Sequence, residues 1–234
     1  MKNLKIFSSV AEYENAKSEG LLITPNISFI NESGSIICLP KLEDPYNGYE
    51  YVDLGLPSGL KWAKCNVGAS SPEEYGLYFA WGETTGYTAD DVTSGVRSFT
   101  QDEYNAGPAA SISTNLTLEQ DAANINMCGN WRMPTKDEFK ELVDNCNVVW
   151  INDYNGTGIN GLTFTSNINM NSIFVPAAGS PKDSLMGINA ICFYYTMSWY
   201  SSSNSYSFIR TNGSPILING TGRYLGATIR AVCE

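Results

Sequence analysis

The sequence GNWRMPT at residues 129–135 is followed directly by KDEFKELVDN at Lys136–Asn145, and together they show a helix with its start signal. Thr135 and Glu138 have the spacing of a capping box, in which each side chain accepts a hydrogen bond from a free backbone N–H of the first turn. Three apolar residues then recur at the spacing of one helical face: Phe139, Leu142 and Val143. We predict a helix over Lys136–Asn145 that buries this face.

The residues before this helix are expected to hold it in place. Trp131 is predicted to lie in the core, because a large apolar ring just before a helix is usually buried. Arg132 is predicted to form a partly buried ion pair, because acidic residues are plentiful and a buried guanidinium needs partners that match its fork of donors. A second helix is predicted around residues 117–124, which begin with an acidic first turn.

The rest of the second half shows short strand-like runs separated by turns. The strand-like runs lie at Ser172–Pro176 and at residues 194–199, 206–211, 216–218 and 227–232. Asn-Gly pairs are a strong turn signal, and they occur at 155–156, 160–161, 212–213 and 219–220. We therefore predict an α+β fold of short antiparallel strands, two helices and long loops over residues 47–234.

Residues 1–46 are predicted to form a separate small unit. The pattern indicates a strand over residues 4–7, a helix over 10–19, and a hairpin of runs 27–30 and 35–39 joined by a turn at 31–34. About 46 residues are too few for a core of their own. The unit is therefore expected to oligomerise or dock on a larger assembly, or to pack on its own C-terminal domain.

The composition of the 234 residues excludes several kinds of chemistry. The chain has no histidine, 14 Lys and Arg and 24 Asp and Glu, and its formal net charge is −10. Without imidazole there is no Ser-His-Asp triad, no Cys-His dyad and no HExxH zinc helix. The acidic balance argues against a nucleic-acid partner, because phosphate binding requires clustered Lys and Arg.

The beginning of the sequence does not match an export signal. The apolar run after the basic start stops at Ser8, and Glu12 and Glu14 interrupt it before an h-region forms. No segment approaches the ~20 apolar residues of a spanning helix. We expect synthesis in the cytoplasm without a signal peptide, and no insertion into a membrane.

The six cysteines show no metal-binding or redox spacing. They are Cys38, Cys65, Cys128, Cys146, Cys192 and Cys233. Because none of them form a CxxC pair, a zinc knuckle or a thioredoxin motif is not expected. The chain is not rich in cysteine, so the thiols are either reduced and buried or joined in up to three disulfides.

Several strings occur in a recognisable order along residues 49–233. They are YVDLGLPSG at 51–59, WAKCNVGA at 62–69, GLYFAWGE at 76–83, GNWRMPT at 129–135, FVPAAG at 174–179, SWYSSS at 198–203 and IRAVC at 229–233. In this order they resemble a domain family of Bacteroidetes and their phages. That family has a C-type-lectin fold, related to formylglycine-generating enzymes and to the variable proteins of diversity-generating retroelements. The N-terminal segment, with PNISFI at 25–30, resembles head-fibre proteins of crAss-like phages.

The resemblance implies that the first and last strands of the larger domain pair. Residues 62–65 would then lie near residues 230–233, where Cys65 and Cys233 form either a disulfide or two neighbouring thiols. Cys128 and Cys146, which flank the helix after Thr135, form either a second disulfide or two thiols.

The resemblance also implies a phage virion surface protein, such as a head fibre or capsid decoration. Residues 1–46 would attach it to other virion proteins and form a homo-oligomer, with a trimer favoured and a dimer possible. The lectin-like head would bind host-surface or mucus glycans, or a protein. Its ligand is expected to contact Tyr200, Asn204, Tyr206, Arg210, Asn212, Arg223 and Tyr224, which lie in a stretch rich in residues that adaptable binding surfaces use.

Catalytic and metal-dependent functions are not expected. The usual sugar-binding tripeptides of calcium-dependent lectins are absent, and WIND at 150–153 differs from one of them by a residue. The acidic pairs at 90–91 and 102–103 are expected in exposed loops. We predict no enzyme, no metal and no cofactor. A bacterial lectin-like binding protein is the alternative. An oxidase of the formylglycine-generating type is a remote alternative, because the sequence has no cysteine pair that matches those enzymes.

Overall fold

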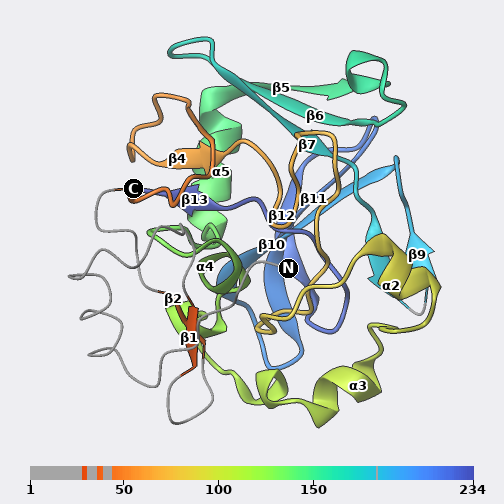
Figure 1. Ribbon diagram of the computed structural model, residues 1–234. Coiled ribbons are helices and arrows are strands. Elements are labelled where there is room, and N and C mark those ends of the chain that lie inside the picture. The colour runs from red at the N-terminus through yellow and green to blue at the C-terminus, as the bar shows by residue number, and fades with distance from the viewer. Residues whose placement is uncertain (1–27, 31–35, 39–43, 183) are drawn as a thin grey trace, which may run out of the picture.

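The computed structural model describes residues 28–30, 36–38, 44–182 and 184–234, with side chains from Asp44 onward (Figure 1). The described helices are α2 (Ala89–Thr93), α3 (Gln101–Ala106), α4 (Ala122–Met127) and α5 (Lys136–Asn145), with 3₁₀ helices at Pro108–Ser111, Leu118–Gln120 and Tyr154–Gly156. The described strands are β1 (Ser28–Ile30), β2 (Ile36–Cys38), β3 (Tyr51–Asp53), β4 (Lys61–Ala63), β5 (Cys146–Ile151), β6 (Gly161–Ser166), β7 (Ser172–Pro176), β8 (Ser180–Lys182), β9 (Ser184–Met186), β10 (Ile191–Trp199), β11 (Asn204–Thr211), β12 (Leu217–Gly222) and β13 (Val232–Cys233).

The strands form short antiparallel sheets. β5-β6-β7, β10-β11-β12 and β13-β4-β3 are three-stranded, while β1 pairs with β2 and β8 pairs with β9. Helices and strands do not alternate as in a parallel α/β sheet, so the predicted α+β class is confirmed. α5 contacts both the β5-β6-β7 sheet and the β10-β11-β12 sheet and so joins them.

The helix predicted from the capping box is confirmed residue for residue. The Thr135 side chain accepts from the Glu138 backbone N–H at 3.2 Å, and Glu138 accepts from the Thr135 N–H at 2.7 Å. Glu138 also forms the predicted ion pair with Arg132, at 2.7 Å. The next residue, Phe139, is buried on the apolar face and stacks on Phe208 of β11, with ring centroids 5.0 Å apart. One helix thus anchors the loop before it and the sheet beneath it.

Two strands expected in the N-terminal unit are also present. β1 and β2 pair antiparallel within the predicted runs 27–30 and 35–39, and β2 lies beside α4 (Figure 1). The predicted strand over 4–7, helix over 10–19 and turn over 31–34 lie outside the described residues. Pro45 and Tyr46, the last residues of that predicted unit, accept hydrogen bonds from the Asn130 N–H and the buried Trp131 indole.

The last strand of the larger domain pairs with its second strand, not with its first, so residues 62–63 lie near residues 232–233 as expected. β13 runs antiparallel to β4, with Val232 opposite Trp62 and Cys233 opposite Lys61. The possible Cys65–Cys233 disulfide is nevertheless wrong, because both are free thiols. Cys65 lies four residues beyond Lys61, which is roughly 13 Å along an extended chain.

The possible Cys128–Cys146 disulfide is wrong as well. Cys146 is a free thiol, whereas Cys128 is disulfide-bonded, but not to Cys146. The physical reason is the helix between them. α5 has 10 residues and is therefore about 15 Å long, and Cys146 lies beyond its far end.

Several local predictions are wrong at short helices. The helix expected over 117–124 is broken at Asp121, which adopts an extended conformation and caps α4. The acidic residues at 90–91 and 102–103, expected in loops, begin α2 and α3, where Asp91 and Glu103 complete capping boxes. Residues 47–234 therefore contain helices beyond the two predicted there. The Asn-Gly pair at 219–220, expected as a turn, lies inside β12.

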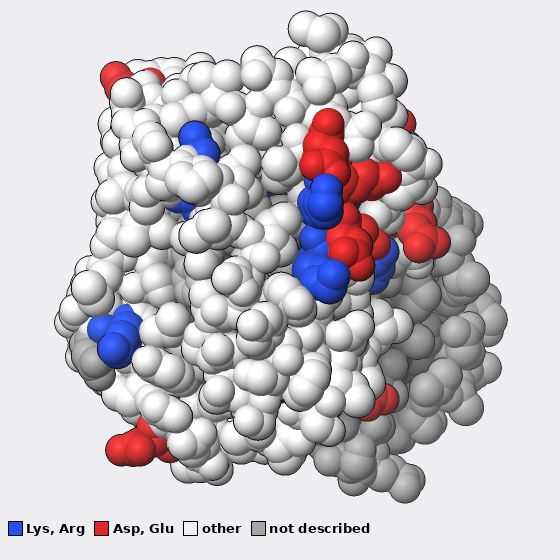
Figure 2. Space-filling view, turned by 180° about the vertical axis from the view of Figure 1, so that it is seen from behind, with Lys and Arg blue, Asp and Glu red and all other residues white. Residues whose placement is uncertain are grey.

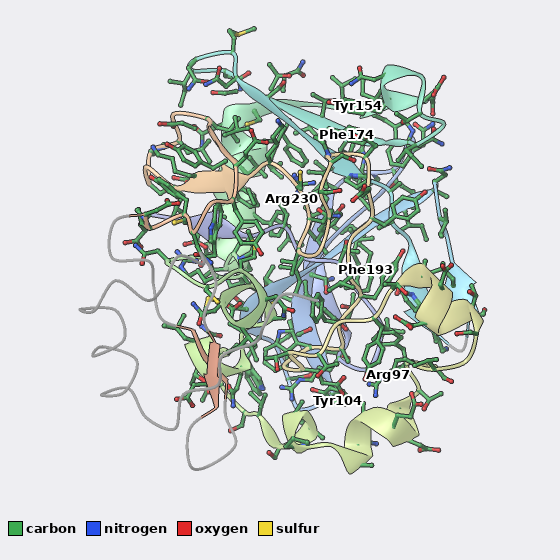
Figure 3. The ribbon with its side chains drawn as sticks, viewed as in Figure 1. Arg97, Tyr104, Tyr154, Phe174, Phe193 and Arg230 are labelled. Atoms are coloured by element: carbon green, nitrogen blue, oxygen red, sulfur yellow. The ribbon has the colours of Figure 1, made fainter. Side chains whose placement is uncertain are left out.

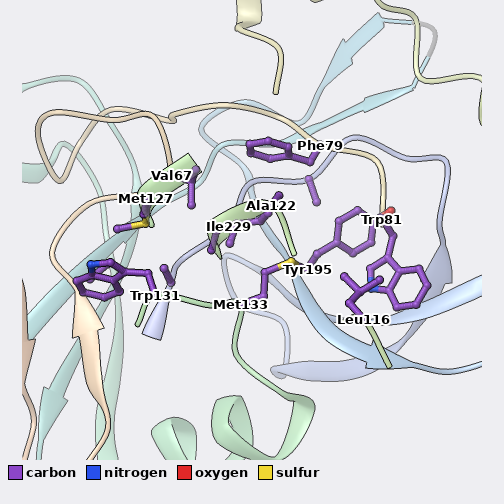
Figure 4. Close-up of a cluster of buried hydrophobic side chains, with 14 of the residues drawn as sticks. Val67, Phe79, Trp81, Leu116, Ala122, Met127, Trp131, Met133, Tyr195 and Ile229 are labelled. Atoms are coloured by element: carbon purple, nitrogen blue, oxygen red, sulfur yellow. The ribbon is translucent and has the colours of Figure 1, made fainter. Parts of the chain in front are cut away.

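β10 separates two apolar clusters of the core. Phe193 and Tyr195 face a cluster with Trp81, Trp131 and Met133, shown in Figure 4. The alternate residues of β10 face the second cluster, which contains Trp62, Phe139 and Phe208 and lies between the sheets joined by α5. Among the described residues, no helix combines the length and apolar composition that crossing a bilayer requires.

Arg230 is a completely buried cation at the centre of the domain (Figure 3). Its guanidinium donates to Asn66 Oδ1 at 2.9 Å, to the carbonyls of Ala63 and Lys64, and to the Phe174 carbonyl at 2.9 Å. These acceptors are neutral, and burial lowers the pKa of Arg230. One side chain thus ties the segment before β13 to the end of β4 and the middle of β7.

Asp121 is the buried acid from which we predict a pH dependence. Its carboxylate accepts from the Asn124 N–H at 3.0 Å and from the Met133 N–H at 2.8 Å. We expect Asp121→Ala to lower the free energy of unfolding by about 2 kcal/mol at pH 7, because it removes a helix cap and leaves a buried N–H unpaired. The measurement is urea denaturation.

The cost of Asp121→Ala should grow as the pH falls. Burial raises the pKa of Asp121 from 3.8 to about 6, so between these values the native protein keeps a proton that the unfolded chain has lost. The stability from this group is present below pH 3.8 and is lost as the pH rises through about 6. We expect the cost to be about 2 kcal/mol larger at pH 4.5 than at pH 7. Asp91→Ala is the control. Thr88 lowers the pKa of Asp91, so the cost of Asp91→Ala should become smaller, not larger, as the pH falls. An unchanged or smaller cost of Asp121→Ala at pH 4.5 contradicts this prediction.

Candidate functional site

The exposed end of the β10-β11-β12 sheet brings together three of the seven predicted ligand contacts. Tyr200 follows β10 and is 43 % exposed, while Asn204 and Tyr206 lie on β11 and are partly exposed. Asn204 and Tyr206 are two residues apart on one strand, so their side chains lie on the same face. The turn between the strands is closed by the Ser201 N–H, which donates to the Asn204 carbonyl at 3.0 Å.

Tyr200 and Tyr206 form an edge-to-face pair on this surface. Their ring centroids are 4.9 Å apart and the ring planes are inclined by 76°. Gly220 of β12 is the cross-strand partner of Tyr206. A Cβ at position 220 would lie 2.8 Å from the Tyr200 ring, so the ring rests where only glycine leaves room. We call Tyr200, Tyr206 and Gly220 the tyrosine platform.

Arg223, predicted to lie on an exposed face, is instead buried beneath this surface. It is 1 % exposed, and its guanidinium lies 4.5 Å from the centroid of the Trp81 ring. It donates to the carbonyls of Ser201 at 2.6 Å, Asn204 at 3.3 Å and Ile112 at 2.7 Å. The expectation that Arg223 lies on an exposed face is therefore wrong. Its donors are used to hold the turn that presents Tyr200 and Asn204.

Three further predicted contacts lie away from the platform. Arg210 is on the same face of β11 as Tyr206 but four residues further, roughly 13 Å along the strand. Phe208 lies between them and is buried under α5, so the helix separates the two positions. Asn212 is in the exposed turn after β11, and Tyr224 is partly buried against the apolar cluster that contains Val92 of α2.

Sequence reasoning missed Lys136 as a neighbour of the platform. Its Nζ lies 5.3 Å from the centroid of the Tyr206 ring and 2.9 Å from Asp137 Oδ1. The hydrogen bond to Asp137 raises the pKa of Lys136, so the amine is charged at neutral pH. The Lys136 N–H also donates to Ser198 Oγ at 3.0 Å. The first turn of α5 is thereby fixed beside the platform, and no signal in the sequence pointed to this contact.

Substituting Gly220 by alanine tests whether the position of the Tyr200 ring depends on this glycine. We expect Gly220→Ala to displace the exposed Tyr200 ring and to change the stability by less than about 1 kcal/mol, because the ring is free to rotate into solvent. Tyrosine side-chain NMR signals and urea denaturation measure the two effects. The control is Gly107→Ala, whose added Cβ would meet the nearest backbone atom at an ordinary 3.5 Å. Unchanged Tyr200 and Tyr206 signals in Gly220→Ala would show that the ring does not depend on this glycine.

The thiols and carboxylates do not assemble a comparable site. No group of three or more Cys, Asp or Glu side chains in the described part of the chain is arranged to hold a metal ion. A cavity of about 330 Å³ is lined in part by Tyr49, Cys65, Ser70 and Met127. Burial raises the pKa of Cys65, so its thiol stays protonated at neutral pH and is a poor nucleophile there.

No family model, no curated protein and no solved structure matches this chain.

Proposed function

We propose that this chain is a recognition protein of a phage particle surface, with a C-type-lectin-like head that binds a glycan of the host surface or of mucus without calcium. The observation that carries the proposal is the tyrosine platform. An exposed tyrosine ring offers an apolar face to the C–H groups of a sugar and a hydroxyl to its O–H groups. The platform is built into the sheet by Gly220 and by the buried clamp of Arg223.

The rim of the platform supports the same proposal. Ser202 and Ser203 are exposed, and the Asn204 side chain is partly exposed next to them. Hydroxyl and amide groups donate and accept hydrogen bonds, which suits the many hydroxyls of a sugar. Tyrosine, serine and asparagine together are typical of adaptable binding surfaces. The role proposed is binding, with no catalytic step.

Residues 1–46 are proposed to attach the head to other virion proteins and to assemble a trimer. The support is the small size of this unit and its short β1–β2 hairpin, since a two-stranded hairpin is marginal by itself. The light-scattering mass of the full chain tests this part of the proposal. We expect three times the mass of one chain, and a monomer at all concentrations would contradict self-assembly.

The binding function is tested by applying the full chain to immobilised host-surface and mucin-type oligosaccharides, with and without EDTA. We expect binding to at least one class of sugar, unchanged when EDTA removes calcium. Binding that EDTA abolishes would contradict a calcium-independent site. Absence of binding to every sugar would contradict glycan recognition and leave capsid decoration as the role.

A further inference from the structure

We infer that the tyrosine platform selects neutral sugars over acidic ones, an inference that rests on the proposed glycan-binding function. The first observation is the distribution of charge along the chain. Residues 145–222, which include both sheets joined by α5, hold only four charged residues in 78: Asp153, Lys182, Asp183 and Arg210. About a quarter of the residues in an average domain are charged. Figure 2 shows one face of the molecule, on which charged side chains gather in small groups with broad uncharged surface between them.

The charges nearest the platform are already compensated. Lys136 lies next to Tyr206, but Asp137 is 2.9 Å from its amine, so the pair has no net charge. Arg223 is the cation beneath the turn, and its guanidinium donates to three backbone carbonyls while it is 1 % exposed. A carboxylate or sulfate is held most strongly by a cation whose charge is not already offset. Lys136 keeps free N–H donors, but Asp137 offsets its charge, and the donors of Arg223 are already used.

Arg210 is a cation whose charge is not offset by a neighbouring carboxylate, and it lies elsewhere. Among the described residues its guanidinium has no hydrogen-bond or ion-pair partner, and its Nε is buried without one. The buried Phe208 lies between Arg210 and Tyr206, and α5 crosses the sheet at that point. A sugar stacked on the platform is therefore separated from Arg210 by the helix.

The net charge of the whole chain also disfavours acidic sugars. At −10, the protein repels an approaching polyanion, and this repulsion extends about a Debye length, ~8 Å at physiological ionic strength. A neutral sugar experiences no such barrier. The selectivity thus has a local cause, the absence of an uncompensated cation at the platform, and a long-range cause, the net negative charge of the protein.

The experiment compares oligosaccharides that differ only in an acidic group. The full chain is titrated with a set of N-acetyllactosamine oligosaccharides and with the sulfated form of each. In at least one pair, we expect Kd for the neutral sugar to be about fivefold or more below Kd for its acidic counterpart. Fivefold is about the factor that the repulsion between two like unit charges contributes in water. Kd for the neutral sugar should change less than about twofold between about 50 and 500 mM salt.

A matched pair of variants tests the local cause. Asp137→Asn leaves Lys136 without its partner beside the platform, so we expect a gain of a few-fold in affinity for the acidic member. Asp144→Asn is the control, because Asp144 is also exposed, also pairs with a lysine of α5, and lies one residue from its far end. The neutral preference would be overturned if the unmodified protein bound the acidic member equally or more tightly. If Tyr200→Ala then lost this binding, the proposed function would still stand. Binding of neither member of any pair would contradict both.

Discussion

Replacing Arg230 with alanine is expected to lower the free energy of unfolding by more than about 4 kcal/mol. The guanidinium is fully buried and donates to Asn66 Oδ1 and to the carbonyls of Ala63, Lys64 and Phe174. Alanine leaves several of these acceptors without a donor in a place that water does not reach, and it opens a cavity between the elements they belong to. Urea denaturation followed by tryptophan fluorescence measures the loss.

Two further variants keep the Arg230 prediction testable if the alanine variant does not fold. Arg230→Lys retains a charge and up to three donors, so we expect an intermediate loss of about 2–3 kcal/mol. Lys64→Ala removes a neighbouring exposed amine that pairs with Glu50, and its effect on stability should be much smaller than that of Arg230→Lys. A loss in Arg230→Lys as small as that of Lys64→Ala would show that the buried guanidinium is not a main support of the fold.

Replacing Tyr200 with alanine is expected to raise Kd for a bound oligosaccharide by about 10- to 100-fold, because a stacked aromatic contact at the centre of a site is worth about 1.5–3 kcal/mol. Tyr200 is 43 % exposed, so the fold should lose less than about 1 kcal/mol. Isothermal titration with the best sugar from the array measures the change. Tyr200→Phe keeps the ring and should stay within about fivefold of the unmodified protein.

The control for Tyr200→Ala is Tyr51→Ala. Tyr51 is 40 % exposed, lies on β3 and contacts another ring, that of Tyr46, at 4.2 Å. The two variants thus remove the same side chain at nearly the same exposure from different sheets. An equal loss of affinity in both variants, or no loss in Tyr200→Ala, would contradict a site at the platform.

The parts of the fold that were predictable depend on local signals. The capping box of Thr135 and Glu138 and the apolar face after it defined α5 to the residue, and the closeness of β4 and β13 followed from the family resemblance. The break at Asp121 was not predictable, because its carboxylate accepts from the distant Met133 N–H as well as from its own helix. A long-range partner of this kind leaves no trace in local sequence spacing.

The segment that holds the site was predictable from the sequence, but the set of side chains that form its surface was not. Tyr200 and Tyr206 were expected from the composition of the stretch, and they lie together. Arg223 was expected beside them but is buried, because the residue after Gly222 leaves the sheet and its donors find carbonyls of the turn. The charge in the apolar run ATIRAVC at 227–233 is a signal in the sequence that Arg230 is buried.

The proposed function requires the ligand to contact the tyrosine platform. Chemical-shift mapping of the full chain, titrated with the neutral oligosaccharide that binds best, measures this contact. We expect the largest shifts at Tyr200, Tyr206, Gly220 and Lys136, with Arg210 and Asn212 unmoved. Shifts that gather at Arg210 and Asn212, or around the cavity beside Cys65, would contradict it.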